Sequence, residues 1–167
     1  MKPLLFFIFF FYLPISTAAE YQSPEDFVQE AFSGSPPKPK SLWIKKDLKP
    51  TVSEILQHSP GFIRTRYWAN NGRTVWILNE IGKTKPITVG IIIDNGSISL
   101  VKVLVFRESR GWEVKHEFFT DQFKEATLQE DLSLDKPVDG ITGATLSVRA
   151  LTKTAKLALF FDQQGRR

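Results

Sequence analysis

The chain has 167 residues and no cysteine. It therefore cannot form disulfide bonds, hold an iron–sulfur cluster, attach a c-type haem through Cys-x-x-Cys-His or bind zinc through cysteine. Without covalent cross-links, its stability must come from an apolar core. Any redox chemistry must come from an organic cofactor or from a metal with nitrogen and oxygen ligands.

Histidines, catalytic motifs and long basic runs are also scarce. His58 and His116 are the only histidines, and they do not have the spacing of a metal site. The sequence has no Gly-x-Ser-x-Gly elbow, Walker loop or Gly-x-Gly-x-x-Gly fingerprint, so serine hydrolase, ATP and NAD chemistry have no basis in it. The formal net charge is +4, but no run of five Lys or Arg occurs, and we expect no nucleic acid partner.

Residues 1–19 have the pattern of a signal peptide. Lys2 precedes an apolar run from Leu4 to Leu13, and Thr17-Ala18-Ala19 offers small residues for cleavage. The apolar run is much shorter than the roughly 20 residues that span a bilayer. We therefore expect cleavage near Ala19 and a periplasmic or other extracytoplasmic location, with peripheral association with the inner membrane as one form of it.

The next segment, residues 20–81, is expected to contain short helices and a hairpin. Helices are predicted over residues 24–32 and 51–58, and a Pro-rich extended linker over residues 33–41 separates them.

Asn-Gly pairs at residues 71–72 and 95–96 predict two β-hairpins, because Asn-Gly is the strongest short-range hairpin signal. The expected strands cover residues 62–69, 73–81, 87–94 and 97–108.

The clearest helix is predicted over residues 146–161, with a short tail over residues 162–167. An aromatic segment over residues 118–128 is expected to be partly helical. These patterns predict an α+β fold, an antiparallel β-sheet with packed helices, in a single domain after the signal peptide. The apolar stripe of the last helix comprises Val148, Leu151, Ala155, Ala158 and Leu159.

The segment Asp139-Gly-Ile-Thr-Gly-Ala-Thr-Leu-Ser147 precedes and enters this helix. Gly140 and Gly143 allow turns that other residues disfavour, and Thr142 and Thr145 are both suitable helix N-caps. The unpaired N–H groups of a helix N-terminus favour phosphate or another anion. From the residues alone, an anion site and a simple Gly-rich helix start both remain open.

This segment closely resembles the flavinylation motif of the FMN-binding domain family. The family pattern is Asp, two variable positions, Ser or Thr, then Gly-Ala-Thr, one variable position, and Ser or Thr. The resemblance implies that an FAD-dependent flavin transferase joins FMN through a phosphoester to Thr145. The matching residues are Asp139, Thr142, Gly143, Ala144, Thr145 and Ser147, with Gly140 between them.

The resemblance covers residues 82–161, the expected FMN-binding domain, and includes Trp112 as a further cofactor-binding candidate. The loop Ser109-Arg-Gly-Trp112 departs from the Thr-Pro-Gly turn of the respiratory-complex members. Arg107 and Arg110 could meet the phosphate or the flavin, or be solvated. Trp112, Phe118, Phe119 and Phe123 could flank the flavin ring, or pack in the core. Asp139 could position the motif or help the transferase activate Thr145, or it could merely cap a loop.

The resemblance implies an extracytoplasmic electron carrier that works between a membrane electron-transfer partner and an acceptor. Two alternatives stay open. One is a flavin-dependent reductase that acts directly on a small substrate, with His116 or Glu108 as proton donor. The other is a non-redox secreted binding module in which the Gly-Ala-Thr loop only starts a helix.

Overall fold

The computed structural model describes residues 18–166. The expected signal peptide lies almost wholly outside this range, so it stays a prediction. The described chain forms one α+β domain, as predicted. Its elements are β1 (Ala19–Glu20), α1 (Pro24–Ala31), β2 (Lys40–Trp43), α2 (Lys49–Leu56), β3 (Arg64–Asn70), β4 (Arg73–Ile81), β5 (Pro86–Asp94), β6 (Ser97–Phe106), η1 (Trp112–Lys115), α3 (Glu117–Thr120), η2 (Asp121–Phe123) and α4 (Thr145–Gly165).

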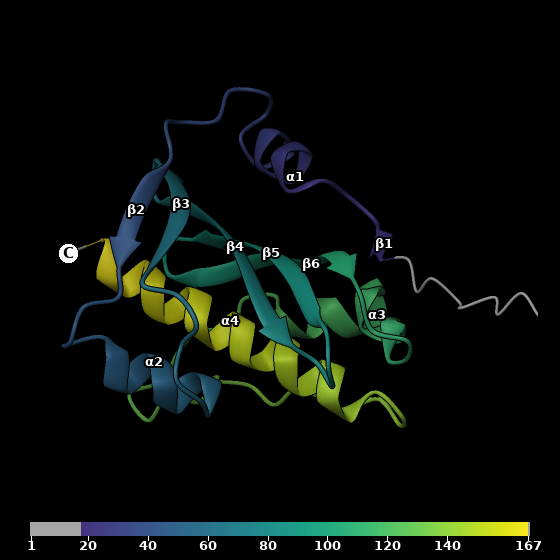
Figure 1. The fold of residues 1–167 in the computed structure, drawn as a ribbon. Coiled ribbons are helices and arrows are strands. Elements are labelled where there is room, and N and C mark those ends of the chain that lie inside the picture. The colour runs from purple at the N-terminus through teal and green to yellow at the C-terminus, as the bar shows by residue number, and fades with distance from the viewer. Residues whose placement is uncertain (1–17, 167) are drawn as a thin grey trace, which may run out of the picture.

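The strands form one antiparallel sheet in the order β1-β6-β5-β4-β3-β2 (Figure 1). Both predicted hairpins are confirmed: β3 pairs with β4, and β5 with β6. Asn71 and Gly72 have φ values of 48° and 80°, and Asn95 and Gly96 have 51° and 95°. Positive φ at both central residues is the geometry that matches the twist of a two-residue hairpin, and Asn-Gly tolerates it best.

The two outermost strands were not predicted. β1 has two residues and β2 has four, and most of their side chains are exposed. Neither shows the alternation of buried and exposed residues by which a strand is recognised in a sequence. Backbone hydrogen bonds to β6 and β3 define them instead. As a result, the end of the expected linker, residues 40–41, lies within β2.

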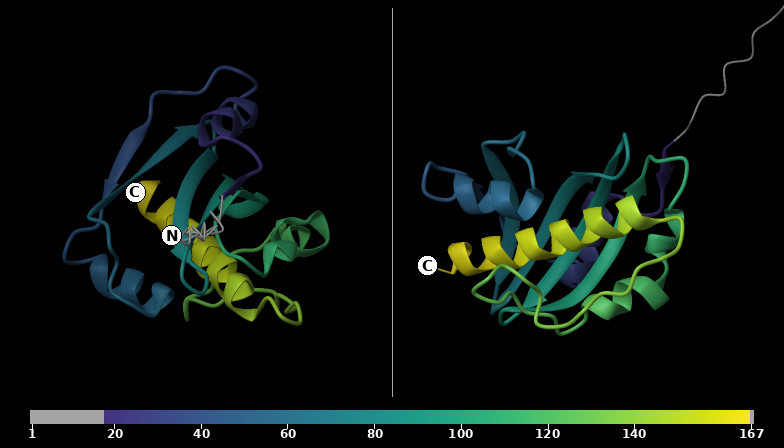
Figure 2. Two further views of the ribbon diagram at one scale, coloured as in Figure 1. Left: turned by 45° about the vertical axis from the view of Figure 1, so that its right-hand side comes forward. Right: turned by 90° about the horizontal axis from the view of Figure 1, so that it is seen from below.

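Helices cover both faces of the sheet (Figure 2). α4 and α2 pack on one face, where Trp76, Ile91 and Leu151 belong to the main core. α1 packs on the other face and places the Phe27 ring against Gly90 of β5. A Cβ atom at Gly90 would lie 2.6 Å from that ring, so glycine is required there for α1 to approach the sheet.

α4 is longer than expected and runs to Gly165. Four residues of the predicted stripe are fully buried, and Val148 is half-buried. The extension is anchored by Asp162, whose carboxylate accepts a 2.6 Å hydrogen bond from Thr74 and pairs with Arg166 at 2.8 Å. Within residues 18–166, no helix combines the length and apolar character needed to cross a membrane.

Candidate functional site

The Gly-Ala-Thr loop leads directly into α4. Ala144 occupies the N-cap position, and no side chain caps the helix. The expectation that Thr142 or Thr145 acts as N-cap is therefore wrong. The Ala144 N–H donates to the Ile141 carbonyl oxygen at 2.9 Å, and this turn starts the helix with Thr145 as its first residue. The N–H groups of the first turn thus remain available to an anion.

The two glycines of the loop differ in what they contribute. Gly143 has a φ of +85°, a left-handed conformation that glycine adopts at low cost, as expected. Gly140 has no positive φ, and a Cβ atom there would meet no atom within 4 Å. The protein fold itself therefore does not require glycine at position 140.

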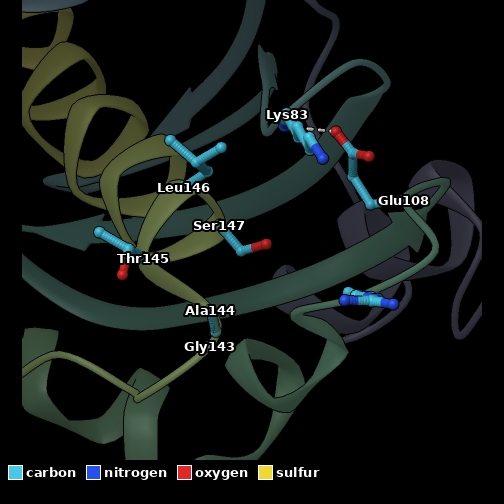
Figure 3. A pocket seen from close by; sticks show the side chains of 8 residues that line it. Lys83, Glu108, Gly143, Ala144, Thr145, Leu146 and Ser147 are labelled. Atoms are coloured by element: carbon cyan, nitrogen blue, oxygen red, sulfur yellow. Dashed lines mark hydrogen bonds between the residues drawn. The ribbon is translucent and has the colours of Figure 1, made fainter.

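A cavity of about 270 Å³ opens at the start of α4 (Figure 3). One wall is the first turn of the helix, and the other comes from the β4–β5 turn and the loop after β6. The Ser147 side chain points toward Glu108, whereas Thr145 lies at the other side of the helix start and is exposed (Figure 3). The lining residues are Lys83, Glu108, Arg110, Gly143, Ala144, Thr145, Leu146 and Ser147.

Glu108 holds the β4–β5 turn against this cavity. Its Oε1 atom accepts hydrogen bonds from the backbone N–H groups of Lys83, Thr84 and Lys85 at 2.5, 2.6 and 2.8 Å. Burial acts to raise the pKa of Glu108, but these three N–H groups outweigh it, and the pKa lies below that of an ordinary glutamate. Glu108 is therefore an ionised wall residue that fixes the position of Lys83.

The charge around the cavity suits a phosphate group. Lys83 and Arg110 bring two cationic side chains to its lining, and the uncapped N-terminus of α4 adds the positive end of the helix dipole. Glu108 keeps its negative charge, but its Oε1 atom is already occupied by three N–H donors, and the two cationic side chains outnumber it. Arg107 does not take part, because its guanidinium donates to the Pro86 carbonyl and the Thr88 hydroxyl within the sheet.

Ser147 and Gly111 lock the helix start to the loop after β6. Ser147 is only 4% exposed, and Gly111 has a φ of +82°. A Cβ atom at Gly111 would lie 2.5 Å from the Ser147 hydroxyl oxygen. The loop Ser109–Trp112 thus differs from the family's usual Thr-Pro-Gly turn but keeps the glycine. Gly111 is required because its backbone is left-handed and because Ser147 lies so close to it.

The aromatic candidates divide into two groups. Phe119 and Phe123 are fully buried and belong to the core, which leaves Trp112 and Phe118 available to a ligand. Trp112 is 46% exposed and Phe118 is 65% exposed. The His116 ring lies between them, 5.5 Å from the Trp112 ring and 6.1 Å from the Phe118 ring.

Asp139 is exposed, and its backbone N–H donates to the Gln122 side chain at 2.7 Å. This contact places the start of the motif beside η2. Lys83 and Leu146 also line the cavity although the sequence did not single them out. Lys83 stands in a hairpin turn outside any motif, so no local pattern marked it. Residues 18–166 contain no group of three His, Asp or Glu side chains that could hold a metal ion.

Comparison with known families agrees with this geometry. A model described as the FMN-binding domain matches residues 82–159, which include the cavity lining and most of α4. Comparisons with curated proteins and with solved structures gave no significant match. Residues 82–159, which contain the cavity lining and the Gly-Ala-Thr loop, thus match the FMN-binding domain family, and the cofactor that this match supports is FMN.

Proposed function

We propose that this protein is an exported flavoprotein that carries FMN through a phosphoester bond to Thr145 and transfers electrons outside the cytoplasm. The observation that carries the proposal is the position of Thr145, which is exposed on the first turn of an uncapped helix at the wall of a cationic cavity. There, the free N–H groups of the first helical turn can bind a phosphate that is esterified to the Thr145 hydroxyl, and Lys83 adds a positive charge to the same cavity.

The three hydroxyl residues of the motif differ in their suitability as acceptors. Ser147 is buried beneath Gly111, so a transferase cannot reach its hydroxyl without moving the loop after β6. Thr142 is exposed but precedes the helix by three residues and does not line the cavity. Thr145 combines exposure with the helix N-terminus. In the attachment reaction, its oxygen would bond to the FMN phosphate of FAD while AMP leaves.

FMN supplies one- and two-electron redox chemistry, and the protein fixes its position and surroundings. We infer an electron carrier that serves a membrane electron-transfer partner, in preference to a reductase with its own substrate. The reductase would need a proton donor beside the flavin. Glu108 suits that role poorly because its lowered pKa keeps it ionised. His116 is exposed and stays the one other candidate.

The attachment is tested by producing the chain together with an FAD-dependent flavin transferase. We expect a fluorescent band on a denaturing gel and an intact mass increased by FMN less one water. Thr145→Ala should abolish both signals, and the matched variant Thr142→Ala should keep them. A fluorescent Thr145→Ala variant, or an unlabelled wild-type chain, would disprove the covalent link.

The carrier role needs a separate measurement. The flavinylated chain, reduced with dithionite, should pass electrons rapidly to a one-electron acceptor such as cytochrome c. It should show no saturable turnover with small organic acceptors. Saturable turnover that His116→Gln abolishes would favour the reductase instead.

A further inference from the structure

The basic residues of the N-terminal half gather at one side of the fold. Residues 38–66, which include β2, α2 and the start of β3, contain seven Lys and Arg against two Asp and Glu. All seven are exposed, and none forms an ion pair with another residue between 18 and 166. They are Lys38, Lys40, Lys45, Lys46, Lys49, Arg64 and Arg66.

A tryptophan lies among these charges. Trp43 of β2 is directly opposite Arg64 of β3, so the two side chains share the outward face of the sheet. The Arg64 guanidinium lies 5.5 Å from the centre of the Trp43 ring. Trp43 is 49% exposed, and the adjoining Ile63 is 72% exposed. Lys45 lines the same shallow hollow as Trp43, together with one acidic residue, Asp47.

Protection of a sheet edge does not explain this combination. β2 is the last strand of the sheet, and lysines on an edge strand discourage pairing with other chains. An exposed Trp43 and Ile63 beside that edge have the opposite effect. Tryptophan together with Lys and Arg is typical of surfaces that meet anionic lipid, where the ring lies at the headgroup level and the cations contact phosphate.

We propose that this basic face, defined by Trp43, Lys45, Lys46 and Arg64, binds the surface of an anionic lipid bilayer. Gln164, near the end of α4, lines the same hollow as Trp43, whereas Thr145 begins the helix. With a rise of about 1.5 Å per residue, the two ends of α4 are roughly 30 Å apart. The bound molecule would thus hold its Gly-Ala-Thr loop away from the lipid, at the far side of the fold (Figure 1).

The proposal does not depend on flavin attachment and is tested by sedimentation with vesicles at low salt. One set of vesicles contains a third phosphatidylglycerol in phosphatidylcholine, and the other contains phosphatidylcholine alone. We expect the full chain to bind the anionic vesicles at least tenfold more tightly, and 0.5 M salt to remove the difference. The variants of this face leave residues 1–19 unchanged, so they separate its contribution from binding through the apolar residues 4–13.

Two triple variants with the same change in net charge distinguish binding by this face from a general effect of charge. The triple variant Lys45→Glu/Lys46→Glu/Arg64→Glu should lower the partition coefficient by about 100-fold or more, and Trp43→Ala by several-fold. The triple variant Lys102→Glu/Lys124→Glu/Lys156→Glu changes the net charge equally and should keep most of the binding. Far-ultraviolet circular dichroism checks that each variant is folded.

Three results would overturn the proposal. They are an absence of binding, equal binding to both kinds of vesicle, and an equal loss of binding in the two triple variants. An absence of vesicle binding would instead favour an acidic protein partner for this face.

Discussion

At the scale of single residues, the start of α4 depends on a contact between Gly111 and Ser147. These two residues are 36 positions apart in the chain, yet a side chain on Gly111 would collide with the Ser147 hydroxyl. Ser147 thereby becomes a buried anchor, while Thr145, two residues earlier, stays exposed. The same short motif thus contains one buried hydroxyl, that of Ser147, and two exposed ones, those of Thr142 and Thr145.

Gly111→Ala should destabilise the fold by on the order of 1–3 kcal/mol, because the substitution adds left-handed backbone strain to a steric clash. Gly140→Ala is the matched control. It lies in the same site but has neither a positive φ nor a close neighbour, so its effect should stay within about 0.5 kcal/mol. Urea denaturation followed by tryptophan fluorescence measures both. Equal effects would show that the contact does not constrain the loop.

At the scale of elements, the loop after α2 is tied to the sheet through His58. The His58 Nδ1 atom lies 2.9 Å from the Ser59 carbonyl oxygen, and Nε2 lies 3.0 Å from the carboxylate of Glu80 on β4. Both ring nitrogens face acceptors, so the geometry favours the imidazolium. The Glu80 carboxylate is also 3.7 Å from the Lys153 ammonium of α4. The loop after α2, strand β4 and helix α4 therefore meet at this one buried carboxylate.

The hydrogen bonds from His58 to Ser59 and Glu80 raise the pKa of His58 above its ordinary value of 6.5. Folding therefore favours the protonated form. The stability that this contributes is fully present below pH 6.5 and is lost as the pH rises through the folded pKa. We expect the difference in unfolding free energy between wild type and His58→Gln to shrink from pH 5.5 to 8.5, and to stay below about 1 kcal/mol because His58 is half-exposed. A difference that grows with pH would contradict the assignment.

At the scale of the whole molecule, the main core and the candidate cofactor site are built from largely separate residues. α4 packs along β4, β5 and β6, and its buried side chains belong to the main core. The cavity is open at the surface, and Thr145 takes no part in that core. The main core is therefore built mostly from residues outside the cavity opening at Thr145.

The chain made without a flavin transferase should therefore unfold in a single cooperative transition. Its Tm should lie within about 5 °C of that of the flavinylated chain, because ligand contacts at an open surface site add little to a completed core. Differential scanning calorimetry of the two forms measures this. A flavin-free chain without a cooperative transition would mean that the cofactor is part of the folding core.

Prediction from the sequence succeeded where the signal is local. The Asn-Gly turns were predictable because positive φ values depend on two adjacent residues. The stripe of α4 was predictable because the helical period brings near neighbours onto one face. β2 was not predictable, since pairing with β3 across more than 20 residues defines it. The threonine caps were wrongly predicted because the turn closed by Ala144 and Ile141 displaces both threonines from the cap position.

By itself, the sequence determined the α+β class, the two hairpins, the last helix and the position of a Gly-Ala-Thr loop at the start of that helix. Only the tertiary structure decided that Ser147 is buried and Thr145 exposed, that Glu108 is bound by three N–H groups, and that Lys83 faces the cavity. The physical reason is distance along the chain. Backbone preferences and periodicity act between near neighbours, whereas a cavity forms where distant segments meet.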